Sequence, residues 1–306
     1  MGAAHIGPVG SGTSTRRRQA RATDLLPSAD RRVADRGSIV STPTYEIFAI
    51  KYAEVGRKAW GNFVDGDPHE DSDMPLDYFV WAIVGDGRTI VVDTGFDGTM
   101  AKKRQRKIVH PVEEGLEAAG IAHSGVKDVI ITHMHYDHCG NGALFPNARF
   151  HMQDTEMEYV TGRCMCHHQI NHAFEPEDVS RMVYRVFAGH VQFHDGVDEV
   201  APGITVHKIG GHTKGLQCVR VPTARGHVVL ASDATHFYQH IDTRRVFRVL
   251  YNLADMVEGY NTLERLASSK AHVIPGHDPL VLERYPAASK STAGWIARLD
   301  LEPRES

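Results

Sequence analysis

The run THMHYDHCGN, residues 132–141, constrains this chain more than any other segment, because it places three histidines and an aspartate within six positions. The apolar, β-branched segment 127–132 precedes the histidines and predicts a buried strand that ends at them. Imidazole and carboxylate groups are ligands of zinc and similar divalent ions, and a catalytic metal keeps one position open for water. Four ligands in one motif are too many for a single open site. The motif therefore predicts two adjacent metals, with His133 and His135 on one and Asp137 and His138 on the other.

The spacing H-x-H-x-D-H resembles the signature of the metallo-β-lactamase superfamily, which implies an α/β fold built as an αββα sandwich. The resemblance implies further ligands downstream, and they occur in order: His212 in KIGGHTKG, Asp233 in HVVLASDA and His277 in HVIPGHDP. Upstream, TIVVDTGFDG matches the Asp-Thr-Gly turn of the family at Asp93. By this resemblance His212 completes the first metal site, His277 completes the second, and Asp233 bridges both metals.

This ligand set implies hydrolysis. Two metals about 3.5–4 Å apart can share one water and lower its pKa from 15.7 toward about 7. The resemblance implies that the metal-bridging hydroxide attacks a carbonyl and that Asp137 carries a proton to the departing alkoxide. We expect two divalent ions, with zinc as the first choice, although manganese, cobalt and iron accept the same ligands.

Within the superfamily, the chain resembles the N-acyl homoserine lactonase branch in its compact domain, its early extended loop and its Asp-Ala sequence at Asp233. In that branch a tyrosine three residues after the bridging aspartate helps to bind the substrate carbonyl. Here that position is His236, and Tyr238 lies two further on, so either side chain is a candidate for this hydrogen bond. The expected activity is ring opening of an N-acyl homoserine lactone, which quenches a quorum signal. The alternative is a hydrolase of a different lactone, cyclic amide or thioester in small-molecule catabolism.

Other branches of the superfamily fit the residues less well. Only 29 residues follow His277, too few for the glutathione-binding domain of glyoxalase II-like thioesterases. Glutamate is absent at the second ligand position, which disfavours flavo-di-iron oxidoreductases. The bridging Asp233 disfavours secreted metallo-β-lactamases of the kinds that lack it. A metal-binding member without catalytic activity is disfavoured by the complete ligand set.

Three further groups near the motif each have two interpretations. Asp93 either orients a metal-binding imidazole or caps a turn. Tyr136, between two ligands, faces either the substrate cleft or the core. The cluster Cys164-Met165-Cys166-His167-His168 resembles a second metal site by composition, but it lacks the second paired half of a structural zinc site, so we favour chance ligands in a helix or loop.

Patterning predicts a short tail followed by one catalytic domain. Residues 1–40 contain seven arginines, three aspartates and no Glu or Lys, a net charge of +4 against −4 for the whole chain, and we expect them to be disordered. Residues 41–306 form the single domain, since α/β domains of roughly 250 residues commonly stay undivided. Residues 153–195 interrupt the strand pattern and predict a helical insertion near the active site.

The remaining composition limits the partners and the compartment. No apolar stretch is long enough for a membrane span, no apolar region follows the arginines at 16–18 as an export signal requires, and an acidic domain disfavours nucleic acid. Four cysteines without a disulfide framework fit a reducing compartment, so we expect a cytoplasmic protein. The expected partner is a small-molecule lactone, and the resemblance raises a homodimer in which the loop 52–77 reaches the partner.

Overall fold

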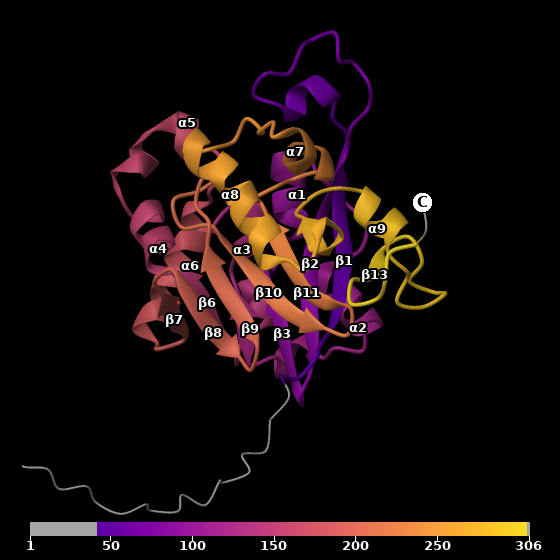
Figure 1. The fold of residues 1–306 in the computed structure, drawn as a ribbon. Helices are drawn as coiled ribbons and strands as arrows, with labels where there is room; N and C mark the ends of the chain where they lie inside the picture. The colour runs from indigo at the N-terminus through magenta and orange to yellow at the C-terminus, as the bar shows by residue number, and fades with distance from the viewer. Residues whose placement is uncertain (1–41, 305–306) are drawn as a thin grey trace, which may run out of the picture. The chain divides into compact units, whose positions relative to one another are not determined.

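The computed structural model describes residues 42–304, and these form two β-sheets packed face to face with helices on the two outer faces (Figure 1). The predicted αββα sandwich is confirmed. The predicted N-terminal extension of residues 1–40 lies outside the described residues. No helix within residues 42–304 is both long enough and apolar enough to span a membrane.

Within this range the larger sheet has eight strands. Its strands are β1 (Glu46–Val55), β2 (Leu76–Gly85), β3 (Arg88–Val92), β4 (Lys107–Ile108), β5 (Asp128–Ile130), β6 (Arg149–Gln153), β7 (Val191–His194) and β13 (Ile296–Arg298). They follow the order β13-β1-β2-β3-β5-β6-β7, and β4 pairs with β1. The neighbours from β3 to β7 pair in parallel, so β3 and β5 end at the same edge of the sheet.

The smaller sheet has five strands in the described part of the chain, in the order β12-β11-β10-β9-β8. Its strands are β8 (Val197–Ala201), β9 (Ile204–Lys208), β10 (Gln217–Thr223), β11 (Gly226–Ser232) and β12 (Val273–Pro275). Strands β11 and β12 pair in parallel and both run toward predicted metal ligands. The edge where β3 and β5 end and the edge where β11 and β12 end together carry the candidate site.

The helices cover the outer faces and the edges of the sandwich. They are α1 (Gly98–Arg104), α2 (Val112–Ala118), α3 (Tyr136–Cys139), α4 (Asp154–Val160), α5 (His168–Asn171), α6 (Pro176–Phe187), α7 (Tyr238–Thr243), α8 (Leu253–Leu266) and α9 (Leu280–Arg284). Helix α8 begins where the Asn252 side chain accepts hydrogen bonds from the amides of Ala254 and Asp255. Helix α6 has proline in its first turn, where no amide donor is lost.

Strand β1 shows how the sequence builds the layers. Alternate side chains point to opposite faces of a strand. Ile50 and Tyr52 therefore pack under the helices on the outer face, whereas Ile47 and Ala49 pack between the two sheets. Both faces of β1 are buried, which explains why its run of apolar residues is nearly continuous.

The predicted strands at 45–53, 77–84 and 88–95 correspond to β1, β2 and β3. Asp86 and Gly87 join the last two with φ angles of +50° and +69°, as a tight hairpin requires. The loop expected at 52–77 is shorter, because β1 continues to Val55 and β2 starts at Leu76.

The segment 153–195 contains α4, α5 and α6, but its last part is not helical. Residues Val191–His194 form β7, which pairs in parallel with β6 at the edge of the larger sheet. The helical prediction was wrong for this end, because a strand of only four residues is too short for its alternation to stand out from the helical segments before it. Strand β13 was not predicted either, because it is only three residues long.

Candidate metal centre

The predicted ligands gather where strands of both sheets end. His133 and His135 follow β5, and Asp137 and His138 lie in the short helix α3 immediately after them. His212, Asp233 and His277 follow β9, β11 and β12, respectively. Open α/β sheets bind ligands beyond the carboxyl ends of their strands. All seven predicted metal ligands are brought together in this way, although they span 145 positions of sequence between His133 and His277 when both ends are counted.

The first group of donor atoms surrounds one point. His133 Nε2 lies 3.0 Å from His135 Nδ1, and His212 Nε2 lies 2.9 Å from the same atom and 3.2 Å from His133 Nε2. Asp233 Oδ2 completes the group at 3.2 Å from His212 Nε2. With metal–nitrogen bonds of about 2.0–2.1 Å, neighbouring donors of a tetrahedral ion stand roughly 3.4 Å apart, so this spacing suits one ion.

The second group lies on the other side of Asp233. Asp233 Oδ1 is 3.0 Å from His277 Nε2 and 3.3 Å from His138 Nε2. Asp137 Oδ2 approaches the same two nitrogens at 3.8 and 3.7 Å. Asp233 thus turns one carboxylate oxygen toward each histidine group, which is the arrangement expected of a bridging ligand.

The chemistry of the donor set fits two cations. His138 Nε2 and Asp233 Oδ1 are buried and have no hydrogen-bond partner among residues 42–304. Buried polar atoms without partners are costly, and a divalent ion satisfies a carboxylate oxygen and several imidazole nitrogens at once. Nitrogen and oxygen donors of this kind suit zinc and its first-row neighbours.

The far nitrogens of three imidazoles are held by acceptors. His138 Nδ1 donates to Asp93 Oδ2 at 2.7 Å, His212 Nδ1 donates to the Val249 carbonyl at 2.7 Å, and His277 Nδ1 donates to the Asp77 carbonyl at 2.8 Å. Each bond leaves the Nε2 lone pair directed into the centre.

Asp93 therefore orients a candidate ligand and is not only a turn residue. Its carboxylate also accepts hydrogen bonds from the amide and the hydroxyl of Thr132, each at 2.8 Å. Asp93 has a φ of +61°, an unfavourable backbone conformation for an aspartate that persists because these contacts hold it.

The electrostatics around Asp233, His133, His135 and His138 favour cations. Burial raises the pKa of Asp233, but His277 and His138 outweigh burial and hold this pKa well below its usual range. Burial and neighbouring imidazoles lower the pKa values of His133 and His135 well below the usual range. Burial also lowers the pKa of His138, yet three nearby carboxylates outweigh it and raise that pKa well above its usual range. The same carboxylates favour a cation at this position.

A cavity of about 140 Å³ lies over the donors, and its lining shows which of the other predicted residues lie near them. Tyr136 lines this cavity, and its hydroxyl accepts a hydrogen bond from Arg106 Nε at 3.1 Å. His236 also lines it, with Nε2 2.9 Å from Asp233 Oδ2 and its ring stacked on Phe247.

Tyr238 does not line this cavity. Its ring packs in the core between the sheets, the Arg284 guanidinium lies 3.8 Å from the ring centroid, and its buried hydroxyl has no hydrogen-bond partner among residues 42–304. Of the two candidates for the substrate hydrogen bond, His236 is therefore the one that reaches the donors.

The structure adds residues that the motif did not indicate. Arg57, Arg104 and Arg106 line the cavity, although they precede the motif by at least 26 positions. Glu156 is buried in α4 and accepts hydrogen bonds from the loops that carry His133, His135 and His212. A glutamate in a helix is usually exposed, so the sequence could have indicated Glu156 only if the buried face of α4 had been known.

A model of the metallo-beta-lactamase superfamily matches residues 74–281, which include all of the predicted ligands. The chain belongs to this superfamily. The match starts before β2 and ends within α9, so it also covers Asp93 and the segment 153–195.

Among members of the superfamily, the chain is similar to N-acyl homoserine lactonase AttM of Azorhizobium caulinodans, with 30% identity over 178 residues. AttM of Agrobacterium fabrum is 27% identical over 180 residues. Each match covers 54% of this chain and 62% of the relative, so the chain matches less than two thirds of these lactonases.

Solved structures share the superfamily fold. A quorum-quenching N-acyl homoserine lactone lactonase superposes with a TM-score of 0.63 at 19% identity, over 78% of this chain and 93% of that one. A probable metal-dependent hydrolase from Staphylococcus aureus gives 0.64 at 14% identity, over 85% and 95% of the two chains.

The cysteine and histidine cluster at 164–168 does not form a metal site among the described residues. Within residues 42–304, every group of side chains close enough to hold a metal consists of the predicted superfamily ligands and His236. Cys164 and Cys166 belong to a 3-10 helix at Arg163–Cys166, and both are free thiols.

Proposed function

We propose that the protein is a two-metal hydrolase that opens the ring of an N-acyl homoserine lactone. The observation that carries this proposal is the position of Asp233, whose two carboxylate oxygens face two separate histidine groups beneath a small cavity. Similarity to N-acyl homoserine lactonases supports the substrate class. Zinc is the proposed metal, because nitrogen and carboxylate donors at these spacings suit it.

Two bound cations would polarise the ester carbonyl and make water acidic enough to attack near neutral pH. His133, His135 and His212 would hold one of them, and Asp137, His138 and His277 the other, with Asp233 between them. Water attacks the carbonyl carbon, the bond to the ring oxygen breaks, and the proton of the water passes to that oxygen. Asp137, the most exposed of the proposed ligands, moves this proton.

Side chains that line the cavity would donate the hydrogen bond to the substrate carbonyl. His236 Nε2 is already within hydrogen-bond distance of Asp233, so it positions the bridging carboxylate. The Tyr136 hydroxyl accepts from Arg106 Nε and lies 3.4 Å from the Tyr78 hydroxyl. With Tyr78 as the donor of that contact, Tyr136 keeps its own hydrogen for the substrate. We assign the hydrogen bond to the substrate carbonyl to Tyr136.

The experiment is a comparison of substrates on zinc-loaded protein, followed with a pH indicator. Short- and long-chain acyl homoserine lactones are tested beside a γ-lactone, a thioester and a cephalosporin. We expect the homoserine lactones to be opened most efficiently, and Asp233→Ala to lose both turnover and metal. Asp242→Ala, at an exposed position of α7, is the matched control and should keep both. Turnover by Asp233→Ala, or none with any lactone, contradicts the proposal.

A specific observation favours the second candidate, a hydrolase of a different lactone or ester. Arg57 and Arg106 line the cavity, and within residues 42–304 their guanidinium groups donate to neutral acceptors, the Asn62 side chain for Arg57 and the Tyr136 hydroxyl and Arg104 carbonyl for Arg106. Uncompensated guanidinium groups would attract an anionic substrate. Faster opening of a carboxylated lactone than of the acyl homoserine lactones, lost in Arg106→Gln, would favour this candidate.

The same proposal includes a reducing compartment, the cytoplasm, because all four cysteines are free thiols. A homodimer stays a prediction, and light scattering of the purified protein tests it.

A further inference from the structure

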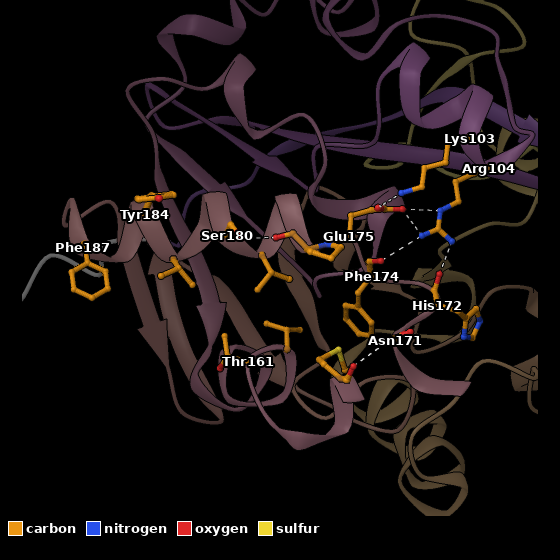
Figure 2. Close-up of a pocket in the computed structure, with 15 residues that line it drawn as sticks. Lys103, Arg104, Thr161, Asn171, His172, Phe174, Glu175, Ser180, Tyr184 and Phe187 are labelled. Carbon is orange, nitrogen blue, oxygen red and sulfur yellow. Dashed lines mark hydrogen bonds and ion pairs between the residues drawn. The ribbon is translucent and has the colours of Figure 1, made fainter. Parts of the chain in front are cut away.

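A long groove runs beside α6, next to the metal cavity. It has a volume of about 1080 Å³, and its walls come from α1, α4, the 3-10 helix at Arg163–Cys166, the segment 171–175 and α6. Figure 2 shows its two ends: Arg104 and His172 lie at one, and Tyr184 and Phe187 lie at the other. Helix α6, which forms one wall, has twelve residues and is therefore roughly 18 Å long at about 1.5 Å per residue.

The middle of the groove is apolar. Val160, Met165, Phe174, Val179 and Val183 line it, and all of them are buried or partly buried. At the far end, the side chains of Tyr184 and Phe187 are 77% and 88% exposed. Large apolar side chains so exposed along one groove indicate a binding surface for an apolar ligand.

The near end of the groove adjoins the metal centre. Arg104 and His172 line both the groove and the metal cavity. Phe174 lines the groove, and its ring centroid is 4.4 Å from that of the candidate ligand His135. A single side chain thus separates the apolar groove from the donors.

The two cations at this end share one buried carboxylate. Lys103 and Arg104 both form ion pairs with Glu175, whose side chain is only 2% exposed. Arg104 also donates to the backbone carbonyls of His172 and Phe174, which holds the segment between the two cavities in place. Both cations at this junction are thus held by acceptors of the protein, and the wall beyond them is apolar, which suits an uncharged chain.

We propose that the groove binds the alkyl tail of an acyl lactone whose ring lies at the metal centre, so that long-chain acyl lactones are the preferred substrates. This inference rests on the proposed lactonase function and adds the class of acyl chain. Each buried methylene contributes enough binding free energy for a roughly three- to fourfold effect. With part of the tail in the groove, kcat/KM for a dodecanoyl lactone should exceed that for a butanoyl lactone on the order of 100-fold.

The test fills the groove from α6. Val183→Trp places an indole among the apolar wall residues, and Glu177→Trp places the same side chain on an exposed position of the same helix. We expect Val183→Trp to lower kcat/KM for the dodecanoyl lactone about tenfold or more and to leave the butanoyl lactone unchanged. Glu177→Trp should leave both unchanged. Calorimetric titration with ring-opened N-dodecanoyl homoserine should show the same loss of affinity in Val183→Trp only, which gives a readout that does not depend on turnover.

Each contrary outcome has a distinct meaning. Equal rates for both lactones that Val183→Trp does not change would overturn the groove assignment and leave the proposed function standing. No opening of either lactone by zinc-loaded protein would overturn both. A change from dimer to monomer in Val183→Trp, with the chain-length preference intact, would make the groove a contact between two copies and would also overturn the assignment. Tyr184→Ser, which removes the ring at the far end of the groove wall, should lower kcat/KM for the dodecanoyl lactone alone. This variant tests the groove even if Val183→Trp does not fold.

Discussion

Glu156 Oε2 accepts a hydrogen bond of 2.7 Å from the hydroxyl of Thr213, the residue that follows the candidate ligand His212. The same oxygen accepts from the Gly215 amide, and Oε1 accepts from the amide of Met134, between His133 and His135. One buried carboxylate from α4 thus ties together the two loops that carry the first histidine group.

Glu156→Ala should therefore loosen the first group and destabilise the protein. The variant leaves three buried donors without an acceptor, each worth about 1–3 kcal/mol, so the free energy of unfolding should fall by roughly 3 kcal/mol or more. Urea denaturation measures the change. Glu158→Ala, on the exposed side of the same helix, is the control and should stay within about 0.5 kcal/mol of the parent protein. Equal stability of the two variants would contradict the role of Glu156.

Asp93→Asn should weaken the second metal selectively. The amide cannot supply the negative charge that orients His138, and loss of such a partner typically lowers metal affinity about 10–100-fold. We expect the metal content after dialysis to fall from two ions per chain to one at a lower chelator concentration than in the parent protein. Asp97→Asn, which keeps a good cap on α1, should follow the parent curve. Simultaneous loss of both ions would argue against a separate role for Asp93.

Metal removal should lower the thermal stability of the protein. Metal at about 1,000 times its Kd stabilises the folded state by about 4.1 kcal/mol, which corresponds to a decrease in Tm of roughly 10 °C after chelation. Scanning calorimetry with and without chelator checks this. Asp233→Ala should show no comparable difference between the two conditions, because its bridging carboxylate is gone. If neither zinc nor chelator changes the Tm of the parent protein, the metal centre is contradicted.

Tyr238→Phe and His236→Ala should separate the two candidates that follow Asp233. The Tyr238 hydroxyl lies in the core without a partner in the described range, so its removal should change kcat/KM by less than about twofold. His236 lies within hydrogen-bond distance of the bridging carboxylate, and its loss should lower kcat/KM about 10- to 100-fold. Steady-state kinetics on the best lactone decides between them. A large loss of activity in Tyr238→Phe would reverse this assignment.

Local sequence was enough to predict the parts of the site that depend on neighbours in the chain. A buried strand delivers His133 and His135 to its carboxyl end, and the alternation of side chains in β1 determines which face each residue occupies. The hairpin at Asp86 and Gly87 follows from residues that tolerate positive φ. The family resemblance added the distant ligands in the correct order, and the superfamily match supports that resemblance.

Side-chain chemistry and strand patterning are local properties, so the sequence alone is enough to predict which residues can bind metal and which strands carry them. The packing of distant elements, in contrast, brings His236 to the centre and Tyr238 into the core, joins two ligand loops through Glu156, and places the α6 groove beside His135. These relationships depend on the directions in which side chains leave different elements. Those directions are set when the two sheets and the helices pack against one another, and no spacing along the chain encodes them.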